Sequence, residues 1–163
     1  PALAEETVNS NDSADFEEVS VFGISVAIDQ PAYWTDFMPP GWHAPVISMA
    51  LRVFNHSYIP VTFDFTTSQR YDFAIYNSNG IEVWRWSDDK AFLQVLGQVT
   101  LEPGESVRYA VKHKFVDSCN DTKEKPMPVD LYTLKGELTA RDTQLLVPRT
   151  MEGEVNFWHT YVY

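Results

Sequence analysis

The feature that most constrains this chain is an alternation of apolar and polar residues with a period of two, which runs from about residue 19 onward. In "VISMALRVFN", residues 46–55, every second residue from Ile47 to Val53 is apolar. Such alternation is typical of antiparallel strands that bury one face and expose the other. The same period is found in "SVFGISVAID" (20–29), "PVTFDFTT" (60–67), "YDFAIY" (71–76), "ESVRYAVKHKFV" (105–116), "DLYTLKGELTA" (130–140) and "EVNFWHTYVY" (154–163).

The turns between these runs favour the same fold class. "NSNG" at 77–80 predicts a hairpin turn in which Gly80 takes a positive φ, and "EPGE" at 102–105 is a second Pro-Gly turn. The best helical candidate is one or two turns in "DDKAFLQVLGQ", residues 88–98. Short strands at this spacing predict an all-β fold, an immunoglobulin-like antiparallel β-sandwich of about eight or nine strands.

One segment departs from the alternation. "DQPAYWTDFMPPGWHAP", residues 29–45, contains four prolines and several large aromatic residues, and we expect it to be irregular. Long irregular segments of this kind are usually functional or packed against the domain.

Charge is unevenly spread along the chain. The net charge is −11, and the first 51 residues contain eight Asp or Glu and no Lys or Arg. Residues 1–18 are predicted to be an acidic flexible arm, and residues 19–163 a single sandwich domain. An acidic chain without a basic stripe repels phosphate, so nucleic acid and anionic membrane surfaces are not expected as partners, and no apolar run is long enough for a transmembrane helix.

Compartment signals are few. Ala2-Leu3-Ala4 is a small-x-small triplet like that at a signal-peptidase site, which together with the acidic arm favours export or a cell-envelope location. The single cysteine, Cys119, cannot form an internal disulfide and is interpreted as a loop thiol.

The sequence predicts no catalytic residues, no metal site and no cofactor. None of the four histidines has another His or Cys at zinc-ligand spacing, and paired acidic residues such as Asp88 and Asp89 are interpreted as solvated charge. Neither a nucleophile elbow nor a phosphate-binding glycine loop is present. The expectation is therefore a protein that is not an enzyme.

The run from about 46 to 139 resembles the intracellular proteinase inhibitor (BsuPI) family. The resemblance lies in "LRVFNHSYIPVTFDFTTSQRYDFAIYNSNGIEVWRWSDDKAF", then "LEPGESVRYAV", then "LYTLKGELTA". It implies a β-sandwich that inhibits serine proteases of the subtilisin type, and hence a cytoplasmic location as the alternative to export.

Under that reading, candidate partner-binding residues are apolar side chains that could enter a protease cleft. Phe37 and Met38 belong to the 29–45 segment, whereas Leu93 and Leu96 belong to the connection "AFLQVLG". Arg70 or Arg85 would suit a trypsin-like pocket instead.

The alternative is a cell-envelope module that binds protein or carbohydrate without inhibiting, for which Trp34 and Trp42 are the best candidates because exposed aromatic rings grip sugars and peptides. A structural role through an edge strand is a third possibility.

"EVWRWS", residues 82–87, is the return strand of the hairpin that begins with "YDFAIY". Alternation places Trp84 and Trp86 on one face, where we expect them to cover neighbouring strands, with Tyr76 as a candidate neighbour, and it directs Arg85 to the other face, toward Asp72. We interpret this stretch as a structural corner, keep it as an alternative binding surface, and expect the aromatic segment 29–45 to be the main contact surface.

Overall fold

The computed structural model of the chain describes residues 22–39, 41–117, 125–141 and 151–162. These residues form thirteen strands and one short 3-10 helix, η1 (Trp86–Asp89). Nine of the strands are five residues or longer, which agrees with the expected eight or nine. No helix in the described ranges is long and apolar enough to cross a membrane.

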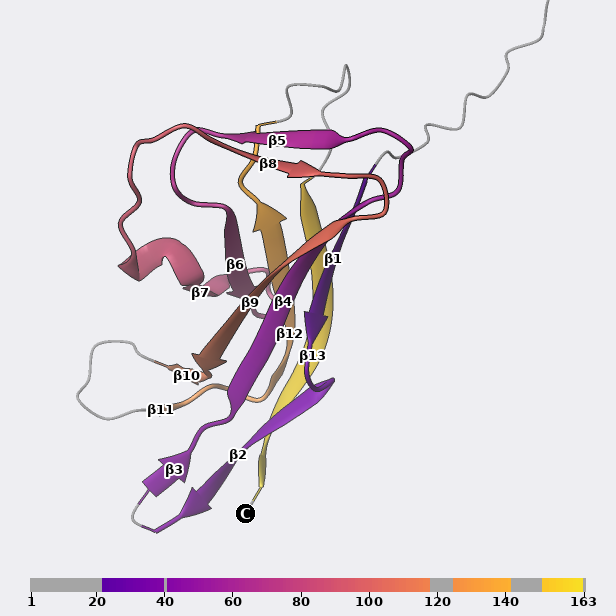
Figure 1. Cartoon of the computed structure of the whole chain (residues 1–163). Coiled ribbons are helices and arrows are strands. Elements are labelled where there is room, and N and C mark those ends of the chain that lie inside the picture. The colour runs from indigo at the N-terminus through magenta and orange to yellow at the C-terminus, as the bar shows by residue number, and fades with distance from the viewer. Residues whose placement is uncertain (1–21, 40, 118–124, 142–150, 163) are drawn as a thin grey trace, which may run out of the picture.

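The strands form two main sheets and two small ribbons (Figure 1). The three-stranded sheet has the order β1 (Phe22–Ile28), β4 (Val46–Asn55), β9 (Ser106–Lys114). The six-stranded sheet has the order β3 (Gly41–His43), β2 (Ala32–Met38), β13 (Glu152–Val162), β12 (Asp130–Leu138), β6 (Tyr71–Tyr76), β7 (Glu82–Arg85). The ribbons pair β5 (Val61–Phe65) with β8 (Gly97–Leu101), and β10 (Val116–Asp117) with β11 (Lys125–Pro126).

The two main sheets pack face to face, with β1 lying against β12 and β13 (Figure 1). The chain changes main sheet between β1 and β2, between β3 and β4, between β4 and β6, between β7 and β9, and between β9 and β12. This Greek-key arrangement, in which all described strand pairs except β2–β13 are antiparallel, is an immunoglobulin-like β-sandwich. The expected fold class is therefore confirmed.

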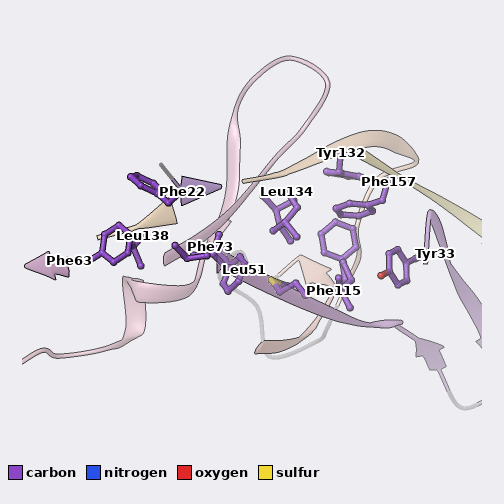
Figure 2. Close-up of a cluster of buried hydrophobic side chains, with 14 of the residues drawn as sticks. Phe22, Tyr33, Leu51, Phe63, Phe73, Phe115, Tyr132, Leu134, Leu138 and Phe157 are labelled. Carbon is purple, nitrogen blue, oxygen red and sulfur yellow. The ribbon is translucent and has the colours of Figure 1, made fainter. Parts of the chain in front are cut away.

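The apolar face of each alternating run supplies the core between the sheets. On β4 the residues Ile47, Met49, Leu51 and Val53 are all 2% exposed or less. Aromatic rings fill one end of the core: Phe115 meets Tyr132 edge-to-face at 5.0 Å, and Tyr132 stacks on Phe157 at 5.6 Å (Figure 2). Each such pair adds about 0.5–1.5 kcal/mol beyond the burial of its surface.

The start of β12 carries a hydrogen bond that is characteristic of this fold class. Tyr132 packs in the core and its hydroxyl donates to the carbonyl of Pro128, four residues upstream, at 2.8 Å. An equivalent tyrosine corner occurs in many immunoglobulin-like domains. The same carbonyl lies 3.1 Å from Nδ1 of His159, so two elements are tied to one backbone atom.

Gly136 on β12 is required by the distance between the sheets. A Cβ built at this position would lie 2.8 Å from Cγ2 of Val26, which projects from β1 of the facing sheet. The glycine therefore allows β1 to approach β12 closely.

The expectation that residues 29–45 are irregular is wrong. Most of this segment forms a hairpin of β2 and β3, in which Phe37 lies opposite Trp42. Strand β2 also pairs in parallel with β13, with Tyr33 opposite His159. The alternation is hidden in the sequence because Thr35, a polar residue, occupies a fully buried position, where its hydroxyl lies 2.9 Å from Nε2 of His159.

The crossing from β1 to β2 is held by Asp29. Its carboxylate accepts hydrogen bonds from the hydroxyl of Tyr33 and from the backbone N–H of Ser48. These contacts lower the pKa of Asp29, while burial and the bond to Asp29 raise the pKa of Tyr33.

Turn predictions are confirmed, and the helix prediction is confirmed only in part. Gly80 and Gly104 have φ of 74° and 78°. The 3-10 helix ends at Asp89, and residues 90–96 then run without regular structure into β8. The predicted acidic arm, residues 1–18, the Ala2-Leu3-Ala4 triplet and Cys119 lie outside the described residues.

Candidate functional site

The segment between η1 and β8, residues 90–96, is an exposed apolar stretch outside the strands, as is the loop before β5, where Tyr58 is 98% and Ile59 64% exposed. Leu93 is 69% exposed, Val95 49% and Leu96 86%. Among the described residues, no hydrogen-bond partner is found for the backbone of Gln94, Val95 or Leu96. The segment thus presents both apolar side chains and open backbone groups to a partner.

The middle of this segment is held by a reciprocal pair of hydrogen bonds to Ser68. The backbone N–H of Ser68 donates to the carbonyl of Leu93 at 2.8 Å, and the N–H of Leu93 donates to Oγ of Ser68 at 2.9 Å. On the near side the ring of Phe92 lies 5.8 Å from Trp86. The segment is therefore anchored before the exposed Leu96.

The far side of the segment is held by β8. Gly97 begins this strand opposite Phe65 of β5. Arg70 lies against the same glycine, since a Cβ at Gly97 would lie 2.3 Å from Nη2 of Arg70. The guanidinium of Arg70 also lies over the ring of Phe65 at 4.4 Å and donates to the carbonyl of Thr67 at 2.7 Å. Arg70 therefore supports the base of the segment.

"EVWRWS" forms the corner from which the segment leaves. Trp84 stacks on His113 of β9, with ring centroids 4.0 Å apart, and Trp86 stacks on Tyr71 at 4.5 Å. Both tryptophans pack against the core. The suggested contact with Tyr76 is wrong, because Tyr76 lies on the opposite face of the sheet, with Arg85.

Arg85 leaves on the other face, as expected. Its Nη1 donates to Oδ2 of Asp72 at 3.1 Å, its Nη2 to Oε2 of Glu82 at 2.7 Å, and Nη2 also to the hydroxyl of Tyr76 at 3.2 Å. Hydrogen bonds from Arg85 lower the pKa of Glu82, and the same ion pairs raise the pKa of Arg85. Asp72 additionally accepts from Oγ of Ser87 at 2.6 Å.

His113 is neutral at physiological pH. Its position beneath Trp84 removes water from the imidazole, and this burial lowers the pKa of His113 to about 4, while the charge of Asp89 opposes the shift. The stack is thus one between two uncharged rings.

The aromatic candidates of the β2–β3 hairpin are divided between its two faces. Phe37 and Trp42 lie together, 5.2 Å apart, on the face that also carries Tyr161 of β13. Trp34 and Met38 alternate with Phe37 along β2, so they lie on the opposite face, where they are 52% and 55% exposed. The hairpin therefore has two small aromatic surfaces and not one.

Two residues escaped the sequence reasoning, one beside the hairpin and one at the anchor of residues 90–96. Trp158 of β13 is 56% exposed and lies opposite Ala32 of β2, so it shares a face with Trp34. Its alternation with the buried Phe157 and His159 could have revealed it. Ser68 carried no signal at all, because its role depends on a contact 25 residues away in sequence.

Within the described ranges, no group of three or more His, Cys, Asp or Glu side chains is placed to hold a metal ion. His159 is fully buried and is engaged by Thr35 and Pro128, and burial lowers its pKa. The one carboxylate row of note joins Asp72, Glu137 and Glu152 across neighbouring strands, and burial followed by the charges of its neighbours raises the pKa of Glu137.

The fold and this segment define an immunoglobulin-like sandwich that presents an extended, exposed apolar connection. Residues 43–143, more than half of the chain, match the family described as "BsuPI: Intracellular proteinase inhibitor". The chain belongs to this family. No curated protein matches the chain significantly.

Several solved structures have a similar backbone arrangement at low sequence identity. The CARDB domain of PF1109 from Pyrococcus furiosus is 10% identical, with a TM-score of 0.45, over 86% of this chain and 94% of that one. A β-glucosidase from Erythrobacter marinus is 13% identical, with a TM-score of 0.45, over 85% of this chain and 15% of the enzyme. Spo0M, a sporulation control protein from Bacillus subtilis, is 12% identical, with a TM-score of 0.43, over 89% of this chain and 51% of that protein. No function follows from these similarities.

Proposed function

We propose that this protein is a non-catalytic inhibitor of a serine protease of the subtilisin type, and that residues 90–96 enter the protease cleft. Family membership supports a proteinase inhibitor. The observation that carries the choice of segment is that Leu93 and Leu96 are strongly exposed while the backbone on either side is anchored.

The geometry suits the mechanics of inhibition. A protease binds its substrate as an extended strand through main-chain hydrogen bonds, and residues 94–96 have backbone groups free to make them among the described contacts. Subtilisin-like enzymes favour bulky apolar residues in their primary pocket, and the two leucines meet that requirement.

Resistance to turnover would come from the scaffold. If the protease cleaved within residues 94–96, the near end would stay bound to Ser68, and the far end would stay in the β5–β8 ribbon. The two new termini would remain close together, so that religation would compete with release. Pre-organised inhibitors of this kind move little on binding.

A trypsin-like target is disfavoured by the two candidate arginines. Arg85 makes ion pairs with Asp72 and Glu82, and Arg70 is engaged by Phe65 and Thr67. Either guanidinium would have to lose these partners before it could fill a primary pocket.

The test is a titration of subtilisin with the full chain, using Leu93→Ala and Leu96→Ala. Each variant removes an exposed side chain at the centre of the contact, so we expect one of them to weaken inhibition by about 30-fold or more, the effect of an interface hot spot of about 2 kcal/mol. Ile81→Ala is the matched control, because Ile81 is 59% exposed and lies in a hairpin turn elsewhere.

Three results separate the alternatives. Stoichiometric inhibition that Leu96→Ala or Leu93→Ala abolishes and Ile81→Ala leaves intact supports the proposal. No inhibition at micromolar protein refutes it. Inhibition that depends on Phe37 would move the contact to the β2–β3 hairpin.

The second candidate is a cell-envelope module that binds protein or carbohydrate without inhibiting. The observation that favours it is the exposure of Trp34 and Trp158 on one face of the hairpin and of Phe37, at 49%, on the other. Shifts of tryptophan fluorescence on adding glycans, lost in Trp34→Ala, would support this function over the first.

Two observations point to different cellular compartments. The family description denotes intracellular inhibitors, whereas the Ala2-Leu3-Ala4 triplet and the acidic arm support export. Cell fractionation, together with N-terminal sequencing of the mature protein, distinguishes the two.

A further inference from the structure

The outer face of the three-stranded sheet carries four basic residues, and Asp29, directly after β1, lies at its edge near Lys112. Alternation along β4 and β9 turns four basic residues outward, and no Asp or Glu projects from this face of β1, β4 or β9. The residues are Arg52, Arg108, Lys112 and Lys114, and Ala27, Ala50 and Ala110 lie on the same face. Arg108, Lys112 and Lys114 share one face of β9, and Arg52 joins them from the neighbouring strand β4.

The centre of this face is a row that places like charges directly opposite one another. Ser25 of β1, Arg52 of β4 and Arg108 of β9 are successive cross-strand neighbours. Like charges at directly opposite positions destabilise a sheet. Within the described part of the chain neither arginine forms an ion pair, although Arg52 lies 5.2 Å from the centre of the Phe54 ring. This arrangement favours an anionic partner.

A shallow hollow lies beside the row. Its floor is the backbone at Gly23, over which the imidazole of His56 is placed so closely that a Cβ there would lie 2.5 Å from Nε2. The rings of Phe54 and His56 form one wall, 4.6 Å apart. The hollow is lined by Gly23, Ile24, Ser25, Arg52, Phe54 and His56.

We propose that this cationic face binds an acidic peptide, and that its occupant is the acidic segment of the same chain, residues 5–18. This segment contains six carboxylates and no basic residue: Glu5, Glu6, Asp12, Asp15, Glu17 and Glu18. Three residues separate it from Phe22, the first residue of β1, which is the edge strand of the same face.

Distance permits the contact. Neighbouring strands are about 4.8 Å apart and a strand rises about 3.3 Å per residue, so Arg108 lies roughly 14 Å from Phe22. Asp12 is ten residues before Phe22 and can reach about 33 Å when extended, which is enough to fold back across the face. A tethered segment also acts at high effective concentration.

Nucleic acid is the less suitable occupant. A polyphosphate must approach a molecule with a net charge of −11, whereas the acidic segment is already part of that charge. The inference concerns a different face from residues 90–96, and it does not depend on the proposed inhibition.

The test attaches a spin label to the acidic segment of the full chain. Ser10→Cys provides the thiol to be labelled, and Cys119→Ser removes the native one. Paramagnetic broadening is then recorded for backbone amides. We expect selective broadening around Ser25, Arg52 and Arg108 in about 10 mM salt, where the screening length is about 30 Å, and its loss in about 1 M salt, where that length is about 3 Å.

Charge variants make the test specific. Arg52→Glu with Arg108→Glu should reduce the broadening several-fold, and adding Glu17→Lys with Glu18→Lys should restore it. Lys125→Glu is the matched control, because Lys125 is exposed on β11, outside the face.

Three results would overturn the proposal. Uniform or absent broadening excludes the contact. Broadening that appears only when labelled and unlabelled chains are mixed assigns the segment to a second copy. Duplex DNA that binds the face without competing with residues 5–18 assigns it to nucleic acid.

Discussion

Replacing Asp72 by alanine should destabilise the corner that carries the proposed inhibitory segment. The Asp72 side chain is only 6% exposed and accepts hydrogen bonds from Arg85, from both the N–H and the Oγ of Ser87, and from the N–H of Phe73. Removing one partner of a buried pair costs about 3–5 kcal/mol. The Arg85 side chain is 28% exposed and keeps its ion pair with Glu82. We therefore expect the free energy of unfolding to fall by about 3 kcal/mol, the lower end of that range.

The assay is urea denaturation followed by tryptophan fluorescence, since Trp84 and Trp86 lie in the same corner. A double-mutant cycle with Arg85→Ala isolates the ion pair from the bonds to Ser87, and we expect a coupling free energy of about 1–2 kcal/mol. Lys135→Ala serves as the control, because Lys135 lies in the same sheet and forms no ion pair among the described residues. A loss of less than about 0.5 kcal/mol in Asp72→Ala, the range of an ordinary surface substitution, would refute the reasoning.

Tyr132→Phe should cost about 1 kcal/mol in urea denaturation, because it removes the hydroxyl that donates to Pro128; an unchanged midpoint would show that the bond adds nothing. Lowering the pH should destabilise the protein through His113, whose pKa of about 4 in the folded state lies below its ordinary value of 6.5. This contribution is present above pH 6.5 and is lost as the pH falls toward 4, by about 1–2 kcal/mol after allowance for partial exposure. The free energy of unfolding, measured against pH for the wild type and for His113→Phe, isolates this contribution as the difference between the two profiles. Parallel profiles would contradict the prediction. Gly136→Ala should lower the melting temperature, because its Cβ would overpack against Val26 at a cost of about 1–3 kcal/mol, and an unchanged value would show that the sheets can separate freely.

Fold class could be predicted because alternation is a local property of the backbone. Successive side chains of a strand point to opposite faces, so Ile47, Met49 and Leu51 had to share a buried face whatever strand lay beside them. The positive φ of Gly80 was predictable for the same reason, since a tight hairpin turn requires it locally.

The β2–β3 hairpin could not be predicted, because its pattern depends on a partner far away in the sequence. Thr35 is buried only because His159 provides a hydrogen bond across 124 residues. The parallel pairing of β2 with β13 likewise joins the two ends of the described chain, and no local signal specifies it.

The candidate site was partly accessible to sequence reasoning. Leu93 and Leu96 could be named because they are bulky apolar residues in a connection between strands. Their anchoring by Ser68 could not, since the two backbone segments meet only after the sandwich has formed.

By itself, the sequence determined that the chain forms strands, which side chains those strands bury and which family they resemble, because these depend on residue spacing along one backbone. Only the tertiary structure decided which strands are neighbours. Register is set by contacts between residues that are distant in sequence, and it placed Arg52 opposite Arg108, Trp84 on His113 and Ser68 beneath Leu93. The surfaces through which this protein can act are products of that register.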